Sequence, residues 1–451
     1  MNTFEKRAVI PLALIFASRL FGLFLLLPIF SPYALELAGS TPTNIGVALG
    51  IYGLTQAIFQ MPFGLLSDKI GRKQIITLGL ILFGVGSVVA ALSHHIYGII
   101  LGRALQGAGA IGSTVIALIA DLTQEKNRTK SMAILGISIA ASFFISIVVA
   151  PILDAWIGIS GIFWLMAFST VFSLGLLFGV IPTPSRSIST TQGKLSTLFK
   201  MALTEPELLR FDLGIMIQHA ILTALFVLLP ITLKSHFWLS ESHQWIFYFV
   251  ILLGSFVVAL PLIRFSEKKQ KVRKLFLSAI AIMGFAQLGL AYWTNQLFGL
   301  GISLLLFFIG FNILEIHLPS LISKQAPQSC KGTAMGIYSS SQFFGIFIGG
   351  SFGGWLLGHG HTQSLFVASA FFALLWLIIA WPMKNPVPRN TVTLKIGAVD
   401  STDTQQYTEK LRQLNGVLDV IILAKEGIAY LKVDPNQFNE KDLLDFQLSS
   451  R

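Results

Sequence analysis

The chain has 451 residues, of which 54% are hydrophobic and only 12% are charged, with a formal net charge of +11. Soluble domains carry about 25% charged residues, so this composition excludes a chain whose whole surface faces water. The single cysteine, Cys330, excludes an intramolecular disulfide and a cysteine-based metal cluster. The net positive charge could reflect nucleic-acid binding or membrane topology. The positions of Lys and Arg along the chain decide between these two interpretations.

Twelve apolar segments are long enough to cross a bilayer as helices. The hydrocarbon core is about 30 Å thick and needs about 20 apolar residues at about 1.5 Å per residue. The first segment is too long for a signal peptide and ends without a small-residue cleavage site. We therefore predict an all-α polytopic membrane protein. The segments lie near residues 9–30, 44–66, 74–93, 97–120, 131–153, 160–181, 209–233, 244–264, 274–293, 297–322, 333–357 and 363–383.

Lys and Arg are concentrated in alternate loops. They occur at the N-terminus and after the second, fourth, sixth, eighth and tenth segments, whereas the opposite loops hold almost none, with Lys234 as the exception. This is the positive-inside pattern of membrane proteins. It predicts that both termini are cytoplasmic. It also assigns the basic excess to topology, so no nucleic-acid partner is expected.

The segments divide into two similar halves. A polar stretch rich in Pro, Ser and Thr, residues 182–208, separates an N-terminal six-helix half, 1–181, from a C-terminal six-helix half, 209–383. We predict that this stretch is a cytoplasmic linker. A charged break stands between the second and third segments of each half, at 67–73 and 264–274. Two six-helix halves with matching loops are typical of major facilitator transporters.

The composition changes after residue 383. Residues 384–390 read as a Pro-containing linker, and residues 391–451 as a small cytosolic α+β domain. A strand with alternating apolar residues begins near Val392. A helix capped near Ser401 follows, and then two strands within 418–434 joined by a turn. A last helix is expected at 439–447. This βαββα order is most of a ferredoxin-like unit.

The C-terminal domain could be read as a metal carrier, but residues 391–451 contain no Cys, His or Met. Copper transfer needs such soft ligands, so metal transfer is rejected. A regulatory partner, self-association through an open strand edge and simple stabilisation of the cytoplasmic face stay open.

The charged break "GLLSDKIGRK" at 64–73 needs an explanation beyond topology. Gly64 allows a neighbouring helix to approach closely, and Gly71 permits a turn with positive φ. Arg72 fits the positive-inside pattern. Asp68 does not, so it should either face a helix N-terminus or pair with an arginine.

This stretch resembles motif A of the major facilitator superfamily, and "LGRALQGAGAIG" at 101–112 resembles its motif B. Residues 311–345, together with the C-terminal domain, resemble the YajR-type drug:proton antiporters of that superfamily. The resemblance covers essentially the whole chain. It implies a twelve-helix major facilitator fold in a bacterial plasma (inner) membrane.

The resemblance also implies roles for the matching residues. Motif A would act as a gate that locks one state on the cytoplasmic side. Asp68 would face the start of the eleventh helix near residues 332–334, and Arg72 would pair with Asp121 at the end of the fourth helix. A cluster that only sets topology and turn shape is the alternative interpretation.

Two arginines lie inside membrane segments. Arg19 is about ten residues into the first segment, and Arg103 is about a third of the way into the fourth. A charge at that depth is costly, so Arg19 should face an aqueous cavity or a carboxylate rather than lipid, and Arg103 carries the same penalty. By resemblance to motif B, Arg103 and Gln106 could take part in proton coupling. Helix-to-helix hydrogen bonding is the alternative.

Glu315 is the carboxylate best placed to carry a proton. Asn312 lies three residues earlier on the same face of the tenth segment, and a partly desolvated carboxylate there could bind the coupled proton. A pair with a loop Lys or Arg is the alternative. His219 and His317 titrate in the useful range, although a lone histidine is more often a packing residue.

The fifth segment departs from the antiporter pattern. Exporters usually carry a glycine-flanked Gly-Pro pair there, whereas this chain has Ala150-Pro151 with few glycines nearby. Pro151 remains a candidate kink, but the missing glycines weaken the evidence for export.

These observations favour a secondary transporter that exports small amphipathic or drug-like compounds in exchange for protons. A symporter that imports a sugar or metabolite, and a membrane sensor that signals through the C-terminal domain, are the alternatives. No phosphate-binding loop, nucleophile–base pair or metal constellation is found in the sequence. We therefore expect no enzyme activity, cofactor or metal, and as partners a small-molecule substrate, protons and the lipid bilayer.

Overall fold

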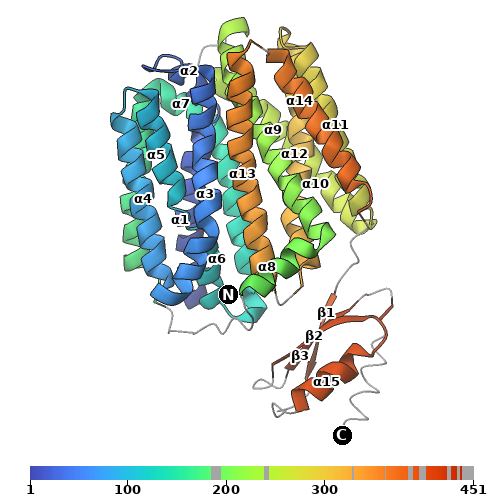
Figure 1. Ribbon diagram of the computed structural model, residues 1–451. Helices are drawn as coiled ribbons and strands as arrows, with labels where there is room; N and C mark the ends of the chain where they lie inside the picture. Colours follow the sequence, from blue (N-terminus) through green and yellow to red (C-terminus); the bar gives the residue numbers. More distant parts are fainter. Residues whose placement is uncertain are drawn as a thin grey trace. The chain divides into compact units, whose positions relative to one another are not determined.

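The computed structural model describes residues 1–183, 195–237, 243–327, 330–360, 362–383, 390–395, 403–423, 428–433 and 437–438. The chain divides into two compact units, one of Met1–Phe265 with Lys274–Met383 and one of Ser266–Arg273 with Lys384–Arg451. The first unit is a bundle of long helices (Figure 1). Its helices are α1 (Thr3–Leu25), α2 (Phe30–Ala34), α3 (Pro42–Ile70), α4 (Arg72–Leu92), α5 (Ile96–Ala108), α6 (Gly112–Asp121), α7 (Glu125–Gly179), α8 (Leu195–Thr204), α9 (Pro206–Phe237), α10 (Gln244–Lys268), α11 (Val272–Tyr292), α12 (Leu297–Gln325), α13 (Lys331–Gly358) and α14 (Thr362–Ala380).

Ten helical stretches in the described residues are long and apolar enough to cross a membrane. One of them is α7, whose 55 residues include a break at Gly158, where φ is 66°. A helix of that length is roughly 80 Å long at about 1.5 Å per residue, enough for two crossings. Counting α7 twice and adding the glycine-rich α13, which has 28 residues, gives the twelve crossings predicted.

Local signals explain where several helices begin and end. Asn2 caps α1 through a capping box with Glu5, so this helix begins at Thr3, ahead of the predicted first segment. Thr41 caps α3, and a proline follows it at the first helical position. Gly71, with φ of 124°, ends α3 and precedes α4.

Two features of the bundle were not predicted. The expected single helix at 97–120 is divided into α5 and α6 by a break after Ala108. Helix α8 lies inside the stretch predicted to be a linker, 182–208, of which residues 184–194 lie outside the described residues. Its Leu198 and Ala202, four positions apart on one face, are buried.

Each half of the bundle has its own apolar core. One large cluster is built mainly from α1–α7 and the other mainly from α9–α14. A few residues cross over, because Phe143 and Ile147 of α7 join the C-terminal cluster and Phe343 of α13 joins the N-terminal one. These residues mark where the two halves pack on each other.

Helix α13 lies between α3 and α9 (Figure 1). A side-chain carbon placed on Gly46 would collide with the backbone at Gly350 and Gly354, and one on Gly349 would collide with Ala220 of α9. Small residues therefore bring the three backbones into contact, as is common where membrane helices pack closely.

The described C-terminal residues form a small sheet and one helix: β1 (Asn390–Lys395), α15 (Asp403–Arg412), β2 (Val417–Leu423) and β3 (Ile428–Val433). The strand order is β1-β3-β2, and both pairs are antiparallel. Leu394, Leu411 and Leu431 belong to a separate core in this unit. The last predicted helix, 439–447, and the cap near Ser401 lie outside the described residues.

Candidate functional site

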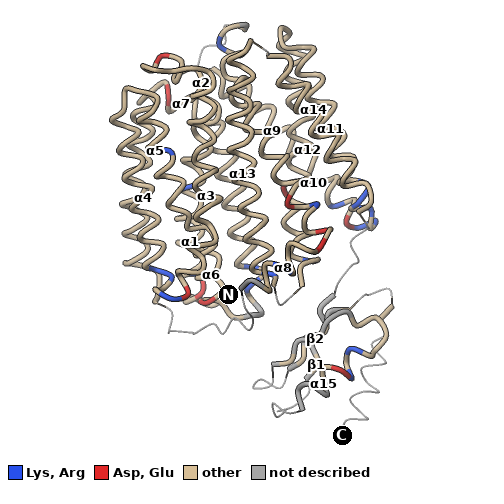
Figure 2. Tube along the Cα trace, in the orientation of Figure 1, with Lys and Arg blue, Asp and Glu red and all other residues tan. Residues whose placement is uncertain are grey.

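Charged residues define the two ends of the bundle. We call the end where α3 ends and α4 begins the basic end, and the end where α1 ends and α3 begins the far end. Figure 2 shows Lys and Arg gathered near the end that holds the N-terminus, which is the basic end, with few at the far end. Charged residues inside the bundle are few, and they include Arg19, Arg103 and Glu315.

The motif-A stretch forms a charged cluster at the basic end. Arg72 Nη1 lies 2.6 Å from Asp68 Oδ1, and Arg72 Nε lies 3.1 Å from Asp121 Oδ2 at the end of α6. Arg72 Nη1 also donates to Ser67 Oγ at 2.6 Å, and Ser67 Oγ donates to the Gly64 carbonyl. The pair between Arg72 and Asp121 that the resemblance implied is therefore present.

Glycines shape this cluster. A side-chain carbon on Gly64 would lie 3.0 Å from Ser113 Oγ of α6, which is a tight contact. The positive φ of Gly71 turns the chain directly from α3 into α4. Together they place Asp68 and Arg72 within reach of Asp121.

The expected partner of Asp68 at the start of α13 is not engaged. Among the described residues, no hydrogen bond or ion pair joins Asp68 to residues 332–334, and its ion pair is with Arg72. The contacts between α3 and α13 run from Gly46 and Gly354 toward the basic end as far as Met61 and Gly336. The far ends of these helices are thus in contact, whereas the gate contact at the basic end is not formed.

Arg19 is almost completely buried, with 2% of its surface exposed. Its Nη2 atom donates to Tyr52 Oη at 3.3 Å and to the Gln106 carbonyl at 3.1 Å. Its guanidinium carbon lies 5.0 Å from the centre of the Phe83 ring, a favourable cation–π arrangement. Its Nε and Nη1 atoms have no hydrogen-bond partner among the described residues. Arg19 therefore lies among protein side chains, and its partners among the described residues are a phenol, a backbone carbonyl and an aromatic ring rather than the expected carboxylate.

The two motif-B residues contact each other. Arg103 Nη1 donates to Gln106 Oε1 at 3.0 Å, and Gln106 Nε2 donates to Ser87 Oγ at 2.8 Å. The guanidinium carbon of Arg103 lies 4.9 Å from the centre of the Tyr52 ring. Tyr52 thus separates the two arginines, whose positive charges have polar and aromatic partners but no carboxylate within ion-pair distance among the described residues.

The C-terminal half holds the complementary negative charge. Glu315 Oε2 accepts a hydrogen bond from Gln218 Nε2 at 3.0 Å and lies 3.9 Å from His219 Nε2. Gln342 Nε2 lies 3.5 Å from Glu315 Oε1 and 2.9 Å from His219 Nε2. Three helices, α9, α12 and α13, contribute to this group, which we call the Glu315 cluster.

The exposure of the Glu315 cluster is uneven. The Glu315 side chain is 34% exposed although it lies within a membrane-spanning helix, whereas His219 is 3% exposed. Gln218 is fully buried. The carboxylate is therefore accessible on one side and held by polar groups on the other.

Asn312 and His317 lie outside the Glu315 cluster. Asn312 Nδ2 donates to Ser255 Oγ of α10 at 2.9 Å, and His317 Nδ1 lies 2.8 Å from the Ile313 carbonyl. At 100° per residue, positions 315 and 317 point to different sides of α12. The part proposed for His317 in proton coupling stays a prediction.

Pro151 lies inside α7, and the backbone leaves the helical conformation seven positions later, at Gly158. The break in the fifth and sixth crossings is thus at the glycine, where φ is 66°. A kink at Pro151 stays a prediction. The proline also lines a cavity at the far end.

Sequence reasoning missed Gln218, Gln342 and Asp212. Gln218 and Gln342 hold Glu315 from two helices, at positions 124 residues apart in the chain. Asp212 of α9 is 7% exposed, and its Oδ1 atom has no hydrogen-bond partner among the described residues. Each is a polar residue inside a predicted membrane segment, and this was the available signal, because burying such a group is costly unless it has a partner.

A helical bundle with two similar halves, membrane-length helices and buried charges at its centre defines a polytopic membrane transport protein. The sequence model of the Major Facilitator Superfamily matches residues 12–350 and 319–416. The chain belongs to this superfamily. It is 40% identical over 444 residues to the inner membrane transport protein YajR of Escherichia coli K12, covering 98% of this chain and 97% of that protein. It is therefore a multi-pass inner-membrane transporter and not an enzyme.

More distant similarities agree with this assignment. The multidrug resistance protein MdtH of Cronobacter sakazakii is 24% identical over 380 residues, covering 79% of this chain and 90% of that protein. A bacterial homologue of the human lysosomal transporter Spinster, solved in an inward-facing and occupied conformation, superposes with a TM-score of 0.69. It shares 14% identity, covers 85% of this chain and 97% of that one, and so supports the fold alone.

Proposed function

We propose that the protein is a proton-coupled antiporter that exports small amphipathic or drug-like compounds by alternating access. The observation that carries this proposal is the Glu315 cluster. Its carboxylate is 34% exposed within a membrane-spanning helix and is bordered by His219. The relation to MdtH, named a multidrug resistance protein, supports the substrate class.

The chemistry proposed for Glu315 is reversible protonation. A charged carboxylate is costly in a low-dielectric interior, and a protonated one is much less so. The amides of Gln218 and Gln342 hold the carboxylate in place in either form. A cationic or amphipathic substrate that occupies the open side would stabilise the charged form, so that substrate and proton compete for one site.

The gate proposal concerns the basic end. Asp68, Arg72 and Asp121 form one cluster in the present state, and among the described residues the ion pair of Asp68 is with Arg72. In the alternative state, Asp68 would face that helix start, where the helix dipole favours an anion. Movement of α13 relative to α3 would then open one end as it closes the other.

We further propose that the basic end faces the cytoplasm, following the positive-inside rule. The C-terminal unit would then be cytosolic. Its strand order β1-β3-β2 is compatible with a ferredoxin-like domain, and a regulatory or self-associating role for it fits its separate core.

The test uses purified full-length protein in vesicles with an imposed pH gradient and a panel of amphipathic compounds. Wild type should move protons against the direction of substrate flux, and Glu315→Gln should abolish the coupling. Glu207→Gln is the matched control, because Glu207 forms a surface pair with Arg210 at 2.6 Å and should behave as wild type.

The possible results separate the candidate functions. Flux of protons and substrate in the same direction identifies a symporter. Full coupling in Glu315→Gln removes Glu315 from the proton path. An absence of transport for every compound, combined with retained ligand-dependent signalling, favours the sensor.

A further inference from the structure

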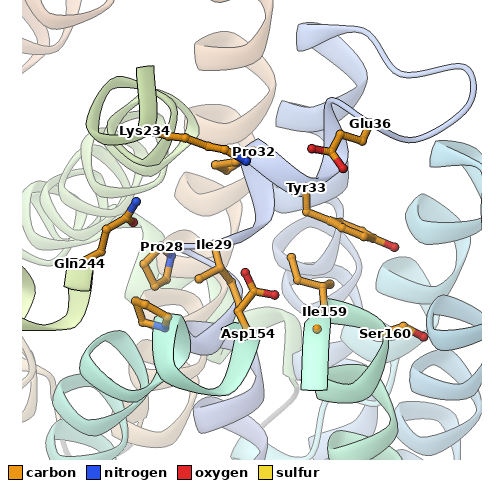
Figure 3. Close-up of a pocket in the computed structure, with 12 residues that line it drawn as sticks. Pro28, Ile29, Pro32, Tyr33, Glu36, Asp154, Ile159, Ser160, Lys234 and Gln244 are labelled. Carbon is orange, nitrogen blue, oxygen red and sulfur yellow. The ribbon is translucent and has the colours of Figure 1, made fainter. Parts of the chain in front are cut away.

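A cavity at the far end is separate from the Glu315 cluster. It has a volume of about 290 Å³, close to the lower limit for small-molecule sites. On one side it is lined by residues between Pro28 and Glu36, a segment that follows α1 and contains α2. Residues of α7 on both sides of its break, between Pro151 and Ser160, line the same side. On the other side, Lys234 of α9 and Gln244 of α10 border it (Figure 3). Both halves of the transporter therefore contribute to the cavity.

The chemistry of the lining is uneven. Glu36 and Asp154 supply two carboxylates, and Lys234 supplies one ammonium group. Pro28 and Ile29 supply apolar walls, and Tyr33 supplies an aromatic ring (Figure 3). The lining thus carries a net negative charge beside an apolar surface.

Tyr33 and Asp154 act as one electrostatic group. Burial and the nearby Asp154 carboxylate raise the pKa of the Tyr33 hydroxyl. The phenol therefore stays protonated at neutral pH and can donate a hydrogen bond while its ring presents a negative face. Asp154 and Lys234 each interact with other residues, so a ligand here joins an existing polar arrangement.

We propose that this cavity is a second ligand site, which binds a small organic cation with an apolar body, such as a protonated primary amine on a ring. The ammonium group would lie near Asp154 and Glu36, where opposite charges attract, and the apolar body would contact Ile29 and the proline rings. The Tyr33 ring adds a cation–π contribution. An anion is disfavoured, because two carboxylates outnumber one ammonium group.

Such a ligand would bind the conformation in which the two halves are in contact at the far end. The lining comes from both halves, and the halves are joined nearby, where Ser31 Oγ of α2 donates to the Phe226 carbonyl of α9 at 3.4 Å. A ligand in this cavity holds the far end closed. This conformational part rests on the proposed alternating access, whereas the binding itself does not.

The first experiment measures binding without transport. Thermal unfolding of the purified full-length protein is followed with increasing benzylammonium, with neutral benzyl alcohol and with phenylacetate. We expect saturable stabilisation by benzylammonium alone. Asp154→Asn should weaken it about tenfold, the loss expected for one charged contact, and Glu36→Gln should weaken it less. Glu207→Gln removes the same charge at the basic end and should leave binding unchanged.

Three results would overturn the proposal. These are stabilisation by benzyl alcohol equal to that by benzylammonium, stronger stabilisation by phenylacetate, and binding of benzylammonium to Asp154→Asn as tight as to wild type. Because Asp154→Asn could alter folding, Lys234→Gln serves as the second variant. It removes the ammonium group that the described residues contribute to the lining and should tighten benzylammonium binding, so weaker binding in this variant also contradicts the proposal.

The second experiment tests the closed far end. Ser31→Cys in a Cys330→Ser background places a single thiol where Ser31 is fully buried. Benzylammonium should slow maleimide labelling of this thiol several-fold when the cavity residues are unchanged. It should not slow labelling when Asp154→Asn is added. Binding without slower labelling would refute the conformational part and the alternating-access proposal at this end, while the ligand site itself would stand.

Discussion

At the residue scale, the ion pairs of the motif-A cluster contribute little to the stability of the fold. Arg72 is 13% exposed in its side chain, and its partners Asp68 and Asp121 are 35% and 29% exposed. Ion pairs with this much solvent access contribute about 0–1 kcal/mol. The cluster is therefore too weak to matter much for folding, and any larger effect would come from the proposed gate, in which Asp68 changes its partner.

We accordingly predict that Asp68→Asn inserts and unfolds like wild type but loses most transport, because the amide keeps the shape and loses the charge. The measurements are the unfolding temperature in detergent and uptake in vesicles, with Glu207→Gln as a control for loss of a partly exposed, ion-paired acid at the same end. Full transport by Asp68→Asn would reduce the cluster to a topology signal.

The Arg103–Gln106 pair represents the opposite case, because both residues are almost completely buried. Gln106 accepts from Arg103 and donates to Ser87, so its removal leaves a charged donor and a hydroxyl without these partners. Leaving a buried polar group unsatisfied costs about 1–3 kcal/mol.

Gln106→Ala should therefore lower the unfolding temperature by several degrees, measured by thermal unfolding in detergent. Gln296→Ala, at an exposed glutamine before α12 that makes no capping hydrogen bond, provides the control. Equal unfolding temperatures for the two variants would mean that water or a neighbour replaces Gln106.

At the element scale, the sequence predicted the membrane-crossing helices but not which helix faces pack against one another. The hydrophobic length rule places the twelve crossings because each must span the same slab. It gives no signal for α8, which is too short to cross. The positions of Gln218 and Gln342 around Glu315 depend on which faces of α9, α12 and α13 meet, and that is decided by packing between distant parts of the chain.

The contact between α3 and α13 leads to a prediction about helix packing. A side chain at Gly46 would collide with the Gly350 backbone, whereas Gly136 of α7 has no atoms within 4 Å of the corresponding position. Overpacking costs about 1–3 kcal/mol, and every 1.4 kcal/mol changes a two-state ratio about tenfold.

Gly46→Val should therefore shift the transporter away from the state closed at the far end, and Gly136→Val should not. Maleimide labelling of the buried thiol in Ser31→Cys reports the shift, and we expect it to become roughly tenfold faster with Gly46→Val. Equal labelling rates in both glycine variants would show that α3 and α13 do not control this end.

At the scale of the whole molecule, the chain consists of a membrane bundle and a C-terminal unit with separate cores. Among the described residues, the bundle's two apolar clusters end at Met383, and the core of the C-terminal unit lies between Val392 and Phe438. The change in composition after the last apolar segment predicted this division. What the C-terminal unit binds could not be predicted, because its described residues present no metal-ligating set.

Separate cores predict independent stability. A chain ending at Met383 should insert in the membrane and unfold within a few degrees of the full-length protein, because no core residue of the bundle is lost. Thermal unfolding and size-exclusion chromatography of both forms provide the comparison, and proton-coupled transport in vesicles provides the functional one. Unchanged stability with altered transport would assign the C-terminal unit a regulatory role. The unit would then affect the equilibrium between transport conformations and not the stability of the bundle. A truncated chain that aggregates or unfolds early would show instead that the unit stabilises the bundle, and the two-unit description of stability would then be wrong.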